Sequence, residues 1–163
     1  VRGSLTDHFD PRTNVKRLSD SVYNSDSVAA VGVAAHEAGH AVQHSEKYGP
    51  IQLRNMILPV ANLGSQLAIP LIIIGFMFEI LSLVRFAIVF FAAAVLFQIV
   101  TLPVEFNASK RAVIALEEGY LHDEEIKGVK KVLSAAAMTY VAAAAVSVAQ
   151  LLRLILLSNR RRD

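Results

Sequence analysis

The sequence predicts a mainly α-helical membrane protein with three transmembrane helices and a small polar region beside them. Of its 163 residues, 54% are hydrophobic and 18% are charged, whereas soluble domains usually carry about 25% charged residues. Three stretches, 55–78, 86–104 and 132–152, contain no charged residue. Each is about as long as the helix of roughly 20 residues that crosses a bilayer. This pattern, without any cysteine, excludes a soluble globular protein, a disordered chain and a disulfide scaffold.

The charge pattern also divides the chain into four parts. Residues 1–54 form a polar segment, 55–104 hold two transmembrane helices, 105–131 form a second polar and helical segment, and 132–163 hold the third transmembrane helix and a basic C-terminus. Two membrane crossings separate the two polar segments. We therefore expect both polar segments to lie on the same side of the membrane.

The first polar segment contains signals for a β-hairpin followed by a helix. Residues 3–8 and 14–19 are predicted to be extended, because Asp10-Pro11-Arg12-Thr13 between them is a typical turn sequence. Asn24-Ser25-Asp26-Ser27 then supplies residues that cap helix N-termini. An amphipathic helix is expected to follow over about 27–47.

The remaining segments are predicted to be helical. Pro59 and Pro70 lie in the first span, so we expect a kinked helix there. The second polar segment is expected to form two helix pieces divided at Gly119. The second of these pieces should continue into the third span, where the alanine-rich residues 135–145 suit close helix packing in lipid.

The residues that carry chemistry are His36-Glu37-Ala38-Gly39-His40, within the predicted amphipathic helix. Positions four apart lie on one face of a helix, so His36 and His40 can both direct a ring nitrogen at one zinc ion. Glu37 lies about 100° around the helix from His36, where it can hold and deprotonate a zinc-bound water. The alternative is an ordinary helix with two satisfied histidines, but this motif on a capped amphipathic helix indicates a zinc hydrolase.

Two histidines leave a zinc site incomplete, so a third ligand is expected. His44 continues the four-residue spacing, but eight residues of helix place it about 12 Å along the axis from His36, too far to share a metal. Glu105 is the first residue after the second span and is the predicted third ligand. As an alternative, it could be a solvent-exposed partner of a helix dipole. Asn107 or Ser109 could orient a histidine from outside the ligand set.

Three longer motifs resemble those of the YugP-like neutral zinc metallopeptidases of bacterial membranes. They occupy residues 3–12, 34–44 and 102–112, and a shorter pair of matches lies at 139–143 and 150–154. The resemblance extends over essentially the whole chain and implies an HExxH-type zinc peptidase with a zincin-like polar region. The implied zinc site is similar to that of HtpX-like and prenyl-protein peptidases, in which a glutamate that opens a later helix completes the site.

The family resemblance also assigns individual residues. It implies His36 and His40 as zinc ligands, Glu105 as the third ligand and Glu37 as the general base. Members of that family usually carry a further N-terminal membrane helix, which we expect to precede Val1.

The function predicted from these observations is a membrane-embedded zinc-dependent endopeptidase. Its reaction also needs a hydrogen-bond donor for the tetrahedral oxyanion, and His8 and Tyr140 are the candidate catalytic residues for this role. The first strand, around residues 5–8, could bind an extended substrate by strand addition, or it could be purely structural.

Two other functions remain as alternatives. In an intramembrane protease of the site-2 type, the motif would lie inside a transmembrane helix, but only residues 27–35 precede His36 without a charge. Such a short apolar stretch does not reach the bilayer centre. In a non-catalytic zinc-binding membrane scaffold, Glu37 would not be needed, yet it is present.

The expected partners are a peptide or membrane-protein substrate, Zn²⁺ and the lipid bilayer. A net charge of +2 without an aromatic-interleaved basic patch argues against nucleic acid. The basic residues Arg160, Arg161 and Arg162 suit an anchor on anionic headgroups. We expect an integral protein of the bacterial cell membrane with its active site on the cytoplasmic side.

Overall fold

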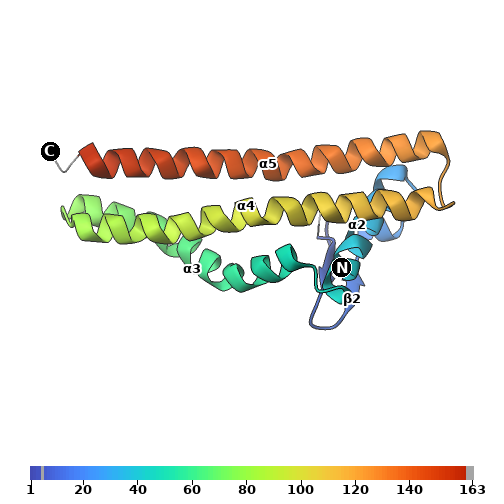
Figure 1. Ribbon diagram of the computed structural model, residues 1–163, viewed down its shortest axis with the longest axis horizontal. Coiled ribbons are helices and arrows are strands. Elements are labelled where there is room, and N and C mark those ends of the chain that lie inside the picture. Colours follow the sequence, from blue (N-terminus) through green and yellow to red (C-terminus); the bar gives the residue numbers. More distant parts are fainter. Residues whose placement is uncertain (5, 161–163) are drawn as a thin grey trace. The chain divides into compact units, whose positions relative to one another are not determined.

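The computed structural model describes residues 1–4 and 6–160 and is mainly helical (Figure 1). Its elements are β1 (His8–Asp10), β2 (Val15–Arg17), α1 (Asp20–Tyr23), α2 (Val28–Ser45), α3 (Gly49–Met77), α4 (Leu81–Glu117) and α5 (Asp123–Arg160). As the sequence predicted, three helices, α3, α4 and α5, are long and apolar enough to cross a membrane.

The chain divides into two compact units, and α4 and α5 contribute to both. The first unit contains Val1–Ile51 and Pro103–Thr139, and the second contains Gln52–Leu102 and Tyr140–Asp163. The first unit therefore combines the hairpin and α2 with one end of each long helix. The second combines most of α3 with the other ends.

The predicted β-hairpin is present, but the predicted position of its first strand, 3–8, is wrong. β1 begins only at His8 and pairs antiparallel with β2, with His8 opposite Arg17. The turn starts at Asp10, whose carboxylate accepts hydrogen bonds from the Arg12 backbone N–H at 2.9 Å and from the Thr13 hydroxyl at 2.8 Å. These bonds end β1 at Asp10. Leu5, the start of the proposed substrate-binding strand, lies outside the described residues.

The helix α2 begins where the capping residues predicted it. The Ser27 hydroxyl accepts a hydrogen bond from the Ala30 N–H at 3.2 Å and so satisfies one free donor of the first turn. One face of α2 then packs on the core of the first unit. That core is formed by Ala112, Leu116, Ile126, Val129 and Leu133, with Val28, Val31 and Ala35 of α2 packed against it.

Glu105 does not open a helix, which corrects the expectation from the sequence. It lies within α4, which continues from Leu81 to Glu117 through Pro103. A proline inside a helix removes one backbone hydrogen bond, and here Val104 and Ala108, both 0% exposed, pack the following turns into the first unit. The alternative of Glu105 as an exposed partner of a helix N-terminus is therefore wrong, because its side chain is buried inside a long helix.

The division predicted at Gly119 is confirmed. Gly119 follows the end of α4 with φ +117°, a conformation that side chains rarely adopt, and α5 begins at Asp123. Three acidic residues in the first turn of α5 lie near its positive end. As predicted, this helix then continues through the third charge-free stretch, 132–152. The terminal residues Arg161 and Arg162 of the proposed anchor lie outside the described part of the chain.

The second unit buries several small residues completely and leaves many large apolar side chains exposed. Ala68 and Ala87 are 0% exposed, whereas Val89 is 70% and Ile73 57% exposed. This is the packing expected of helices surrounded by lipid, because lipid tails solvate large apolar side chains and small residues allow close helix contact. Pro59 and Pro70 lie inside α3, and Figure 1 shows this helix bent.

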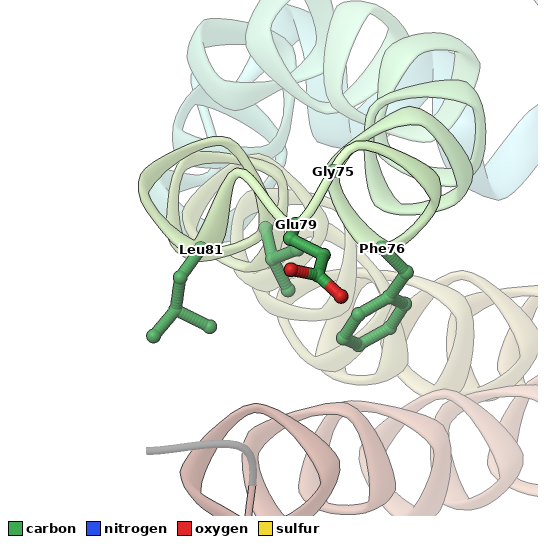
Figure 2. Close-up of a pocket in the computed structure, with 5 residues that line it drawn as sticks. Gly75, Phe76, Glu79 and Leu81 are labelled. Atoms are coloured by element: carbon green, nitrogen blue, oxygen red, sulfur yellow. The ribbon is translucent and has the colours of Figure 1, made fainter.

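A tight turn joins α3 to α4 in this unit. Glu79 takes φ +57° in the turn. Its carboxylate projects into a hollow beside Phe76 and Leu81 (Figure 2).

Candidate metal centre

Three side chains that could hold a metal ion meet in the first unit. His36 and His40 project from one face of α2, and Glu105 projects from α4. His36 Nε2 lies 3.1 Å from His40 Nε2 and 3.2 Å from Glu105 Oε2. His40 Nε2 lies 3.6 Å from the same oxygen. The structure thus brings together the three residues that the sequence suggested as ligands, although they lie up to 69 positions apart.

The spacing of these atoms fits a zinc ion. Zn–N and Zn–O bonds of about 2.0–2.1 Å in a tetrahedral site place neighbouring ligand atoms about 3.3–3.4 Å apart. Two of the measured distances, 3.1 and 3.2 Å, are slightly shorter than this value, and the third, 3.6 Å, is slightly longer. Glu105 is only 3% exposed, and a buried carboxylate needs a compensating positive charge. Two imidazole nitrogens and a carboxylate oxygen therefore form a donor set suited to Zn²⁺.

The other ring nitrogen of each histidine has its own partner. His36 Nδ1 lies 3.1 Å from the Ser109 hydroxyl, one of the two residues suggested from the sequence. His40 Nδ1 lies 3.0 Å from the side-chain oxygen of Gln43. Asn107, the other suggested residue, contacts Gln43 and not a histidine. Such partners orient metal-binding imidazoles and keep them in one tautomer.

Sequence reasoning missed Gln43. It follows His40 by three positions, so it lies on the same face of α2, and it is 0% exposed. The spacing could have suggested it, but a glutamine at that position has no metal-binding chemistry of its own.

Glu37 lies on α2 beside the ligands and is 8% exposed. Burial raises the pKa of its carboxyl group, while the charges of His40 and His36 and a backbone hydrogen bond from Phe9 act in the opposite direction; the net shift is upward. Phe9 belongs to β1, so the hairpin lies directly against the proposed general base.

The remaining candidates do not join the ligand group. His8 lies on β1 with an exposed side chain, and its Nδ1 is 2.8 Å from the Thr6 carbonyl oxygen. His44 is exposed at the end of α2, with its ring centre 5.8 Å from that of Phe9. Tyr140 belongs to α5 in the second unit and is 40% exposed. The oxyanion role of His8 and Tyr140 stays a prediction.

Comparison with known proteins identifies the family. Residues 1–159 match the family model described as "putative neutral zinc metallopeptidase". The chain belongs to this neutral zinc metallopeptidase family. The resemblance that its motifs suggested is therefore confirmed.

One curated protein is similar along the whole chain. It is a Bacillus subtilis (strain 168) protein described as "putative membrane protease YugP", 52% identical over 164 residues. The match covers 100% of this chain and 73% of that protein. No solved structure matches the chain. The family name implies zinc, and the group formed by His36, His40 and Glu105 could bind it.

Proposed function

We propose that this chain is a zinc-dependent endopeptidase of the membrane, in which His36, His40 and Glu105 hold the metal and Glu37 is the general base. The observation that carries the proposal is the convergence of three ligand atoms at distances of 3.1, 3.2 and 3.6 Å. The family and the similar membrane protease support the same activity.

Zinc bound at this site would lower the pKa of a water molecule and polarise the scissile carbonyl group. The chain itself supplies the proton transfers. Glu37 is buried beside the ligands, and its raised pKa suits a group that accepts a proton from the attacking water and passes it to the leaving amine. His8, and Tyr140 as a second candidate, would donate a hydrogen bond to the oxyanion.

The β-hairpin is the proposed place for the substrate backbone. Within the described residues, the sheet consists of β1 and β2. The backbone N–H of Phe9 in β1 forms a hydrogen bond with Glu37. An extended peptide that added to the edge of this hairpin would lie close to the general base. We therefore propose extended segments of peptides or of membrane proteins as substrates.

An intramembrane protease of the site-2 type is less well supported. The helix that carries His36 and His40 is not among the helices found long and apolar enough to cross a membrane in the described chain. The site belongs with the polar segments, and we propose that these face the cytoplasm at the bacterial cell membrane. A non-catalytic zinc scaffold would leave the buried Glu37 without a role.

Zinc content and proteolysis test the proposal together. Detergent-purified wild type and Glu37→Gln should each hold about one zinc per chain, and Glu105→Gln should lose it. Wild type should cleave casein, whereas Glu37→Gln should be inactive while it keeps its zinc. A Glu105→Gln protein with full zinc content would overturn the ligand set. An active Glu37→Gln protein would overturn the role of the base.

A further inference from the structure

Gln43 is a fully buried polar side chain with a partner for each end of its amide. Its Nε2 donates to the Val104 carbonyl oxygen at 2.8 Å and to Asn107 Oδ1 at 2.9 Å. Its Oε1 lies 3.0 Å from His40 Nδ1. Buried polar groups are kept where their hydrogen bonds are satisfied, and here every bond has a defined direction.

The direction of these bonds follows from the backbone. A carbonyl oxygen can only accept, so the end of Gln43 that faces Val104 must be its NH₂ group. The amide oxygen then faces His40, and an amide oxygen also only accepts. His40 must therefore carry its proton on Nδ1, which leaves the lone pair of Nε2 directed toward His36 and Glu105.

The orientation of the Asn107 side-chain amide is also fixed by its hydrogen-bond partners. Arg111 Nε donates to Asn107 Oδ1 at 2.8 Å, so that oxygen accepts from both Arg111 and Gln43. Arg111 is itself held by Glu46, with Nη2 2.7 Å from the carboxylate oxygen. Two groups of α4, the Val104 carbonyl oxygen and Asn107 Oδ1, thus determine the orientation of the Gln43 amide, and Arg111 holds Asn107 in place.

We propose that Gln43 is a positioning residue that holds His40 in the Nδ1-protonated tautomer needed for metal binding through Nε2, with Asn107 and Arg111 fixing its amide. This inference rests on the proposed function. His36 has no equivalent constraint, because the Ser109 hydroxyl beside its Nδ1 can rotate and either donate or accept. Of the two histidines, only His40 has its tautomer dictated by the fold.

Three variants separate this role from a merely structural one. Gln43→Met keeps the length of the side chain and removes the acceptor. Gln43→Glu keeps an acceptor for His40 Nδ1–H but loses the NH₂ group that donates to Val104 and Asn107. Gln66→Met makes the same chemical change at an exposed glutamine of α3 and serves as the matched control. Zinc affinity is measured in each by competition with a chromophoric chelator.

Gln43→Met should bind zinc about 10–100-fold more weakly, the usual effect of removing such a partner. Gln43→Glu should stay closer to wild type, and Gln66→Met should equal it. A loss in Gln43→Met no larger than that in Gln66→Met would overturn the proposal.

A measurement on the unmutated protein gives an independent test. In ¹⁵N-histidine-labelled protein loaded with ¹¹³Cd²⁺, metal coupling should appear at Nε2 of His40, with its Nδ1 protonated. Coupling to Nδ1 of His40 would overturn the proposal. If the wild type binds neither zinc nor cadmium, it is the proposed zinc site itself that fails, so the two failures are distinguishable.

Discussion

Gly39 lies directly against the backbone of Ala108, where α2 and α4 come together in the first unit. A Cβ atom placed on Gly39 would lie 2.5 Å from the Ala108 carbonyl oxygen, closer than real Cβ contacts. Glu105 precedes Ala108 by about one helical turn, and Gly39 directly precedes His40. The absence of a side chain at position 39 therefore lets the ligands on the two helices reach one another.

The first prediction concerns this contact. Gly39→Ala should weaken zinc affinity by roughly 10-fold or more and destabilise the protein by about 1–3 kcal/mol, the usual cost of overpacking. Chelator competition and thermal unfolding in detergent measure the two effects. Gly49→Ala is the matched control, because a Cβ there meets nothing within 4 Å. Normal zinc binding in Gly39→Ala would mean that the helices can separate without loss of the site.

Ser109 is predicted to support His36. Ser109→Ala removes the hydroxyl that lies 3.1 Å from His36 Nδ1 and should reduce zinc affinity by about 10-fold. Ser134→Ala, at an exposed position of α5, should leave the affinity unchanged. If the two variants bind zinc equally well, His36 does not depend on this hydroxyl.

Zinc affinity should fall as the pH is lowered. Burial lowers the pKa of His40, but hydrogen bonds with Glu105 and Gln43 and the charges of Glu105 and Glu37 together raise it more, so the net shift is above its usual value. A protonated imidazole cannot bind metal. An ordinary histidine has a pKa of about 6.5. Zinc affinity should therefore begin to decline at a higher pH here than it would if the pKa of His40 were not raised. Zinc titrations from pH 8 to pH 5 test this, and a flat profile would contradict it.

The β-hairpin should stay folded at pH values well below the usual pKa of an aspartate. Hydrogen bonds from the Thr13 hydroxyl and the Arg12 backbone lower the pKa of Asp10 to about 2. The stability that its ionised form contributes is present above its ordinary pKa of 3.8 and is lost as the pH falls through about 2. Amide exchange of residues 8–17 should stay slow at pH 4.

Substitution of Asp10 tests the same turn at neutral pH. Asp10→Ala should accelerate amide exchange in the hairpin, because the turn loses its acceptors. Asp26→Ala, an exposed aspartate near the start of α2, should not. Equal exchange in both variants would show that the turn does not depend on Asp10.

Single cysteines can test the proposed orientation, because the chain has none of its own. Tyr120, 78% exposed between α4 and α5, should lie in the cytoplasm, and Phe78, 65% exposed before α4, on the other side. A membrane-impermeant maleimide should label Phe78→Cys in intact cells and Tyr120→Cys only after lysis. The reverse pattern would place the site outside, and identical labelling would contradict the two-crossing topology.

The sequence determined those features that depend on local patterns. Charge-free stretches predicted three helices suited to a membrane, because hydropathy is a property of each segment alone. The four-residue spacing of His36 and His40 placed both on one helix face for the same reason. The hairpin was predictable from its turn residues, although the first strand lies later than expected and ends only at Asp10, whose own hydrogen bonds close the turn.

Only the tertiary structure decided how the ligand group is completed and supported. Glu105 lies within α4 and not at a helix start, because the buried turns after Pro103 pack into the first unit and keep the helix continuous. Gln43 gains its role from partners 61 and 64 residues away, Val104 and Asn107. No local pattern encodes such contacts, since they exist only once α2 and α4 have packed at Gly39.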